Sequence, residues 1–127
     1  YDEDVLPYKV KRMSYLGVPT EEVVISESVA EERQFKVLFA RFFTEYVGGV
    51  VFKVEQTGGD VGGSPDGVVD YVFLEGKGVE ILQADEGIVN PVYVMEGTVK
   101  VSVIAPAIAD LNGEKFGVVL AGVENER

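Results

Sequence analysis

The residues that could do chemistry in this chain are mainly carboxylates, because the sequence contains no histidine and no cysteine. Histidine titrates near neutral pH without help, and thiolates are the strongest ordinary nucleophiles and soft-metal ligands. The sequence also has no tryptophan. We therefore expect no catalytic residue and no cofactor, and we predict that the protein is not an enzyme.

A glycine-rich loop at 58–67 holds the metal candidates. Its glycines would let backbone carbonyls and the carboxylates of Asp60, Asp66 and nearby Asp70 approach a calcium ion. The spacing matches no calcium motif, and no lysine ends the loop as in a phosphate-binding loop. We interpret the segment as a hairpin loop, with the three aspartates as calcium candidates.

Two further groups of carboxylates could support chemistry. Segment 110–114 resembles a calcium loop, but its glycine comes two positions too early for the EF-hand turn, so we interpret it as a tight turn. Four glutamates near predicted strand ends could include a pair about 5 to 10 Å apart, as glycoside hydrolysis requires: Glu75, Glu80, Glu96 and Glu114. A carboxylate-based hydrolase is the least favoured function.

The chain is acidic, with 11 basic and 22 acidic residues and a formal net charge of −11. Residues 54–127 carry four basic and thirteen acidic residues, so most of the surplus lies in the second half. This surplus repels a phosphate backbone, and we expect no nucleic-acid partner. No stretch approaches about 18 consecutive apolar residues, so we expect no membrane insertion. Because the chain begins at Tyr1 rather than Met, we expect that an upstream segment was removed or left out.

Length and composition predict one domain preceded by an arm. A chain of 127 residues with 46% apolar residues can build one core. Residues 1–20 contain Pro7 and Pro19 and show no hydrophobic period, which predicts an extended N-terminal arm. Such an arm would be disordered, lie along the domain, or add a strand to a neighbouring subunit. A single β-rich domain is predicted at 21–127.

One amphipathic helix is predicted at about 29–47. Ser28 and Glu31 fit a capping box, and Gly48 and Gly49 supply a stop. Apolar residues recur at offsets of three and four, namely Phe35, Leu38, Phe39, Phe42 and Tyr46. Phe35, Val37 and Phe39 also fit the alternation of a strand, so the alternative stays open.

The hydrophobic period becomes two after Gly49. It predicts strands at 50–55, 68–73, 79–82, 92–104 and 114–121, after a short β-like run at 22–25. The strand at 68–73 reads as nearly buried on both faces. Turns are predicted at 76–78, as a hairpin, and at Asn112-Gly113, with a bulge or bend at Gly97. The fold class is mainly β (α+β): an antiparallel β-barrel or sandwich with one helix and an N-terminal arm.

Residues 91–103 carry the first of two resemblances. Their sequence, PVYVMEGTVKVSV, with residues 113–116 and Gly122, resembles the second half of a cupin jelly roll. Cupins hold their metal through histidines and a glutamate, and this chain has no histidine. The resemblance therefore implies a jelly-roll shape only.

Residues 78–103 carry the second resemblance. An acidic turn, an apolar strand and the EGTVKV-like strand follow one another, and this order resembles the small β-rich decoration proteins of tailed-phage capsids. The resemblance implies a head-stabilising protein that cements capsomers as a trimer through an extended arm.

We predict a non-enzymatic structural subunit of a virion or other extracellular assembly, which contacts its neighbours through β-edges and the N-terminal arm. The expected partners are copies of itself, as a homo-oligomer, or a neighbouring assembly protein. The alternative is a β-sandwich module that binds a small ligand, a glycan or calcium. The composition, rich in valine and glutamate without cysteine or histidine, also predicts a thermostable protein.

Overall fold

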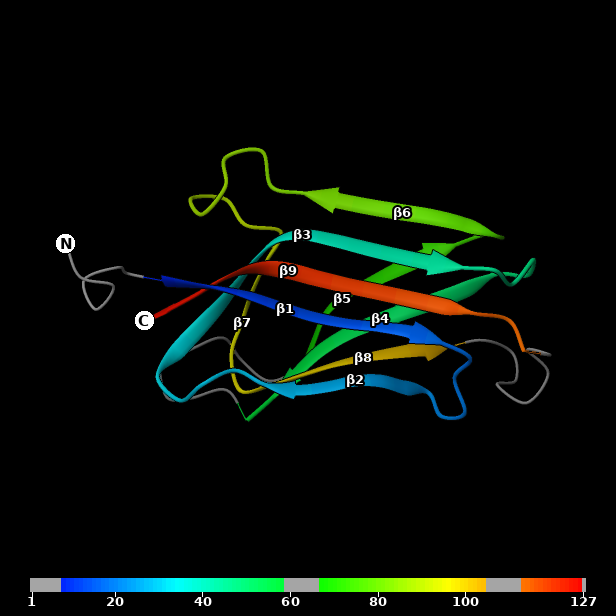
Figure 1. The fold of residues 1–127 in the computed structure, drawn as a ribbon, viewed down its shortest axis with the longest axis horizontal. Coiled ribbons are helices and arrows are strands. Elements are labelled where there is room, and N and C mark those ends of the chain that lie inside the picture. The colour runs from blue at the N-terminus through cyan, green and yellow to red at the C-terminus, as the bar shows by residue number, and fades with distance from the viewer. Residues whose placement is uncertain (1–7, 59–66, 105–112, 127) are drawn as a thin grey trace.

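The computed structural model describes residues 8–58, 67–104 and 113–126, and in these residues the regular structure is entirely β (Figure 1). The strands, in chain order, are β1 (Tyr8–Gly17), β2 (Val23–Ser28), β3 (Arg33–Thr44), β4 (Val50–Thr57), β5 (Gly67–Leu74), β6 (Gly78–Gln83), β7 (Tyr93–Met95), β8 (Thr98–Ile104) and β9 (Phe116–Glu126). Among the described residues no helix is long and apolar enough to cross a membrane.

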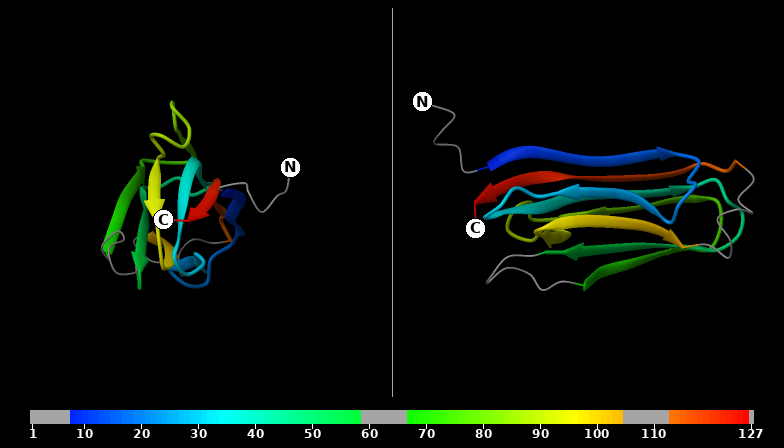
Figure 2. Two further views of the ribbon diagram at one scale, coloured as in Figure 1. Left: turned by 90° about the vertical axis from the view of Figure 1, so that its left-hand side faces the viewer. Right: turned by 90° about the horizontal axis from the view of Figure 1, so that it is seen from below.

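The strands form two antiparallel sheets that stack on each other (Figure 2). The front sheet of Figure 1 has the order β1-β9-β3-β6, and β7 pairs with the other end of β3. The back sheet has the order β2-β8-β4-β5. Neither sheet closes on itself, so the predicted sandwich is confirmed and the closed barrel is not formed.

The core lies between the inner faces of the two sheets. Phe42 of the front sheet is 5.3 Å from Phe52 of the back sheet, measured between ring centroids, and Phe52 is 6.3 Å from Phe116. All three side chains are fully buried. Aromatic and β-branched residues suit such half-buried pleated surfaces, and they fill this core.

The helix predicted at about 29–47 is wrong, because β3 covers most of that segment. Its buried positions are Phe35, Val37, Ala40, Phe42 and Thr44, a mostly two-residue spacing with one three-residue step. That step is a β-bulge between Val37 and Phe39, where the pairing with β9 shifts by one residue. A bulge lets two residues of one strand oppose one residue of the next. The resulting mixture of spacings imitated a helical period.

The predicted hairpin at 76–78 is also wrong, because β5 belongs to the back sheet and β6 to the front sheet. At residues 76–78 the chain crosses from the back sheet to the front sheet instead of reversing within one sheet. The bend predicted at Gly97 is confirmed: its φ is +68°, and it lies where β7 of the front sheet gives way to β8 of the back sheet. Asn112 lies outside the described residues, but β8 and β9 are in different sheets and form no hairpin. Turn residues specify a reversal, whereas burial of the inner faces decides which strands pair.

Within the predicted arm, residues 8–17 form β1, an edge strand of the front sheet. β1 pairs with β9 over ten residues, from Tyr8 opposite Asn125 to Gly17 opposite Phe116. Met13 in its middle is 1% exposed and joins the core. This part of the arm lies along the domain, and residues 1–7 are outside the described part.

Candidate functional site

The aspartates proposed for calcium are only partly placed by the structure. Asp60 and Asp66 lie outside the described residues, whereas Asp70 is on β5 opposite Val54. Asp70 Oδ2 accepts a hydrogen bond of 2.6 Å from the Tyr93 hydroxyl, and Tyr93 is buried on β7 of the other sheet. Burial, together with the bond to Asp70, raises the pKa of Tyr93 far above its ordinary value. Asp70 therefore joins the two sheets, and the described residues hold no group of three or more Asp or Glu placed for a metal ion.

Among the four glutamates that could serve hydrolysis, Glu96 lies at the opposite end of the sandwich from Glu75 and Glu114. Glu75 and Glu114 adjoin the end of the sandwich where Thr44 lies opposite Gly78 and Phe116. Glu96 follows Met95, which lies opposite Phe35 nine positions away along β3. Nine strand residues span about 30 Å, too far for either Glu75 or Glu114 to share a bond-cleaving site with Glu96. The fourth, Glu80, is exposed on β6.

A pocket of about 330 Å³ lies at the Glu96 end of the sandwich. It is lined by the turn between β2 and β3 at 28–33, by Gly58, and by residues 96–98. Glu96 is 1% exposed, and its backbone N–H donates to Gln56 Oε1 at 2.9 Å. Its lining includes the carboxylates Glu31, Glu32 and Glu96 together with Arg33, Val29 and Ala30, a more polar set than the mostly apolar lining of a typical small-ligand pocket. It is one place in the described residues that the ligand-binding alternative could use; a second pocket, of about 560 Å³, lies beside β6 and is lined by residues 81–86 and 90–92.

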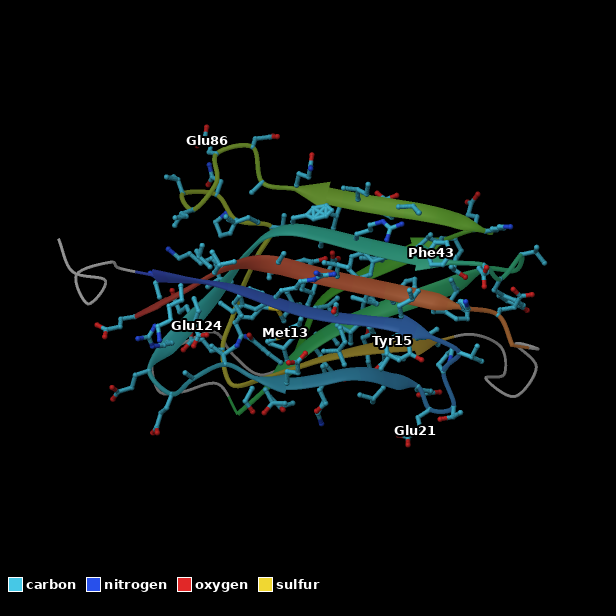
Figure 3. The ribbon with its side chains drawn as sticks, in the orientation of Figure 1. Met13, Tyr15, Glu21, Phe43, Glu86 and Glu124 are labelled. Carbon is cyan, nitrogen blue, oxygen red and sulfur yellow. The ribbon has the colours of Figure 1, made fainter. Side chains whose placement is uncertain are left out.

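The outer face of the front sheet is unusually apolar for a solvent-facing surface. The strand register aligns Leu16, Gly117, Phe43 and Val79 in one row across all four strands. Gly117 has no side chain, and a Cβ built there would lie 3.4 Å from Leu16 and 3.5 Å from Phe43. The side chains of Leu16 and Phe43 therefore lie on either side of the space above Gly117. Figure 3 labels Phe43 on β3 and Tyr15, the neighbour of Leu16, on β1 at the same end of the sheet. Leu16 is 72% exposed.

A second row lies beside the first on the same face. It contains Ser14, Val119, Arg41 and Ile81, one residue from each strand. Ile81 is half exposed, and the Arg41 guanidinium lies 5.8 Å from the Phe43 ring centroid. Sheets that face water usually alternate apolar residues inward with polar residues outward. Here many outward positions are apolar, and polar and cationic residues such as Ser14 and Arg41 lie among them.

The edge strand β5 is the second apolar surface. Its exposed side chains include Tyr71 and Phe73, at 60% and 59%, and Val68. Asp70 is its only charged residue, and the carboxylate of Asp70 accepts a hydrogen bond from the Tyr93 hydroxyl. The prediction that 68–73 is buried on both faces is therefore wrong for its outer face. An edge strand with no layer above it leaves that face in solvent.

Sequence reasoning missed these surfaces because it assigned their apolar residues to the core. Arg41 alternates with Phe42, and Tyr71 alternates with Val72. Such alternation indicates that the two faces of a strand differ. Which face meets solvent depends on the layer that covers it.

Comparison of the chain with protein-family models, with curated proteins and with solved structures finds no match. The two resemblances therefore stay predictions.

Proposed function

We propose that the protein is a non-enzymatic structural subunit of a virion or other extracellular assembly, and that it contacts neighbouring copies through its β-edges and N-terminal arm. The observation that carries this proposal is the exposed, apolar edge strand β5. A sheet edge presents unsatisfied N–H and C=O groups to any chain that can pair with them. Proteins that must stay apart usually shield such edges with charges, prolines or short strands.

The two long sides of the sandwich differ in this respect. On one side, β1 contains Lys9, Lys11 and Arg12, and Glu21 and Glu22 precede β2. On the other side, β5 exposes aromatic and aliphatic residues, and the adjacent edge strand β6 exposes apolar residues too. Charged edges disfavour strand pairing, whereas an apolar edge is a template for it. Pairing is therefore expected on the β5 side.

A second copy is the simplest partner for β5. Two β5 strands that pair antiparallel about a two-fold axis would join two back sheets into one continuous sheet. Such a contact is self-complementary, because each copy supplies the same apolar surface. It also sets Tyr71 and Phe73 of one copy beside those of the other on the outer face, where the four aromatic side chains can contact one another across the paired strands.

The arm offers a different edge. β1 is the first strand, and residues 18–22 connect it to β2 in the other sheet. Its ten-residue ladder with β9 would form equally well with β9 of a neighbouring copy, which is the usual route of strand exchange. Because Met13 belongs to the core, a truncation that tests the arm should end before Tyr8.

Size-exclusion chromatography with light scattering tests the proposal over a range of concentrations. We expect the full chain to associate and Tyr71→Gln/Phe73→Gln to weaken that association at least about tenfold, since burying such side chains contributes a few kcal/mol per contact. The matched control is Val47→Gln/Val89→Gln, which changes two loop valines that are 79% and 78% exposed. A full chain that stays monomeric at millimolar concentration, or a β5 variant that associates like the control, would overturn the proposal.

A further inference from the structure

The outer face of the front sheet concentrates positive charge in a protein that is strongly negative. Its outward positions include Arg12 on β1 and Lys36 and Arg41 on β3. The register places no aspartate or glutamate at an outward position of these described strands. We call this surface, with the apolar rows described above, the basic apolar face.

The geometry of the three cations is compact. Arg41 lies in the row of Val119, Arg12 in the row of Ala121 and Lys36 in the row of Val123. With strands about 4.8 Å apart and rows about 6.7 Å apart, their Cα atoms form a triangle with sides of about 12 to 13 Å. Exposed Leu16 and Ile81 flank it. A partner that fits this face needs carboxylates at similar spacing and some apolar surface.

The opposite kind of surface occurs along β2. Five exposed glutamates lie on this strand and its flanking turns: Glu21, Glu22, Glu27, Glu31 and Glu32. No lysine or arginine occurs between Gly17 and Glu32. Val18 and Val23, both partly exposed, supply apolar surface among them. We call residues 18–32 the acidic edge; Figure 3 labels Glu21 at one end of it.

None of the three cations or five glutamates takes part in the ion pairs seen among the described residues, which join Lys11 to Glu124 and Lys53 to Glu55. The two surfaces also point in different directions, since one is a sheet face and the other a strand edge. One copy therefore cannot satisfy its own basic face with its own acidic edge.

We propose that the basic apolar face of one copy binds the acidic edge of a second copy of this chain. The contact is heterologous, because two different surfaces meet, so it repeats from copy to copy and builds a chain of subunits or a ring. This inference rests on the proposed function, to which it adds a second contact of defined chemistry. Complementary charge also selects the register of the contact against other arrangements.

Charge reversal tests the contact, measured by sedimentation velocity in the Tyr71→Gln/Phe73→Gln background so that the β5 contact does not contribute. The face variant is Arg12→Glu/Arg41→Glu, and the edge variant is Glu27→Lys/Glu31→Lys. We expect each variant alone to lose association at least about tenfold, because like charges then meet. An equimolar mixture of the two should recover it, since the acidic edge of one variant fits the basic face of the other and the reversed pair is complementary too.

Matched controls reverse exposed charges outside both surfaces: Lys77→Glu/Lys115→Glu and Glu75→Lys/Asp85→Lys. These should associate like the background. Loss in the face variant without loss in the edge variant, or no recovery in the mixture, would overturn the inference. Binding of the face to phosphatidylserine vesicles without copy-to-copy association would also overturn it.

The two proposals fail differently. If the full chain associates through β5 but charge reversal has no effect, the proposed function stands and this inference falls. If the full chain never associates, both fall.

Discussion

Gly97 should tolerate a side chain far less well than other glycines of the protein with positive φ. It connects β7 to β8 and has a φ of +68°. A Cβ there would overlap the carbonyl oxygen of Thr57 and lie 2.7 Å from the carbonyl carbon of Gly58. The Gly97 carbonyl also accepts a hydrogen bond of 2.7 Å from the Val29 N–H, so the glycine has little room to move.

The cost of Gly97→Ala has two parts. The left-handed conformation costs a residue with a Cβ about 1 to 2 kcal/mol. Relieving the overlap requires the backbone to shift, and overpacking of this kind costs about 1 to 3 kcal/mol, with about 1 kcal/mol more for the weakened hydrogen bond. We expect Gly97→Ala to lose about 3 to 6 kcal/mol of the free energy of unfolding, a large fraction of the stability of a domain this size.

Gly87→Ala is the matched control, because Gly87 has a φ of +58° and nothing within 4 Å of its added Cβ. It should lose only the conformational part, about 1 to 2 kcal/mol. Denaturant titration followed by far-UV circular dichroism measures both losses, and Gly97→Asn serves if Gly97→Ala does not fold, since asparagine tolerates the left-handed region and keeps the steric overlap. Losses equal to within about 0.5 kcal/mol, the usual scatter of such comparisons, would refute the steric argument.

Three other variants test contacts between and within the layers. Tyr93→Phe removes the hydroxyl that donates to Asp70 and should cost about 1 to 3 kcal/mol near neutral pH. The folded-state pKa of Tyr93 is raised above the ordinary value of 10.0, so the free energy of unfolding of the wild type should fall as pH rises above about 10. The free energy of unfolding of Tyr93→Phe, measured over the same pH range, should fall less steeply. Gln56→Leu removes the acceptor of the buried Glu96 N–H and should lower the free energy of unfolding, measured by urea titration, by about 1 to 3 kcal/mol. An unchanged urea midpoint would contradict this. Phe52→Ala empties the centre of the aromatic cluster and should cost about 3 to 5 kcal/mol in a guanidinium titration, and a loss below about 1 kcal/mol would show that the cluster is not the core.

Local patterns predicted most strands. The period of two after Gly49 places strands where β4, β5, β6 and β9 are found, within a few residues at their ends except that β9 runs on to Glu126. The pattern was sufficient because one inner face of each strand packs against the other layer. The pattern of apolar residues failed to predict β3, where one extra residue between Val37 and Phe39 changes the phase of the alternation. No local rule marks a bulge inside an apolar run.

The candidate surfaces were not predictable in the same way. Tyr71 and Phe42 are both aromatic residues in β-strands, yet one is 60% exposed and the other fully buried. The difference lies in the strand that covers each face, and that strand comes from a distant part of the sequence. The basic apolar face is a further case, since Arg12 and Arg41 come from strands separated by β9.

The sequence alone determined the chemistry available to this protein: carboxylates without histidine or cysteine, a net charge of −11, and strands with a two-residue period. These properties belong to residues or to short segments, so they need no knowledge of the fold. The tertiary structure alone decided which strands share a sheet, which strands form edges, and which apolar and charged residues reach the surface together. The physical reason is that burial and pairing are long-range: β1 meets β9, and their paired residues lie 99 to 117 positions apart in sequence.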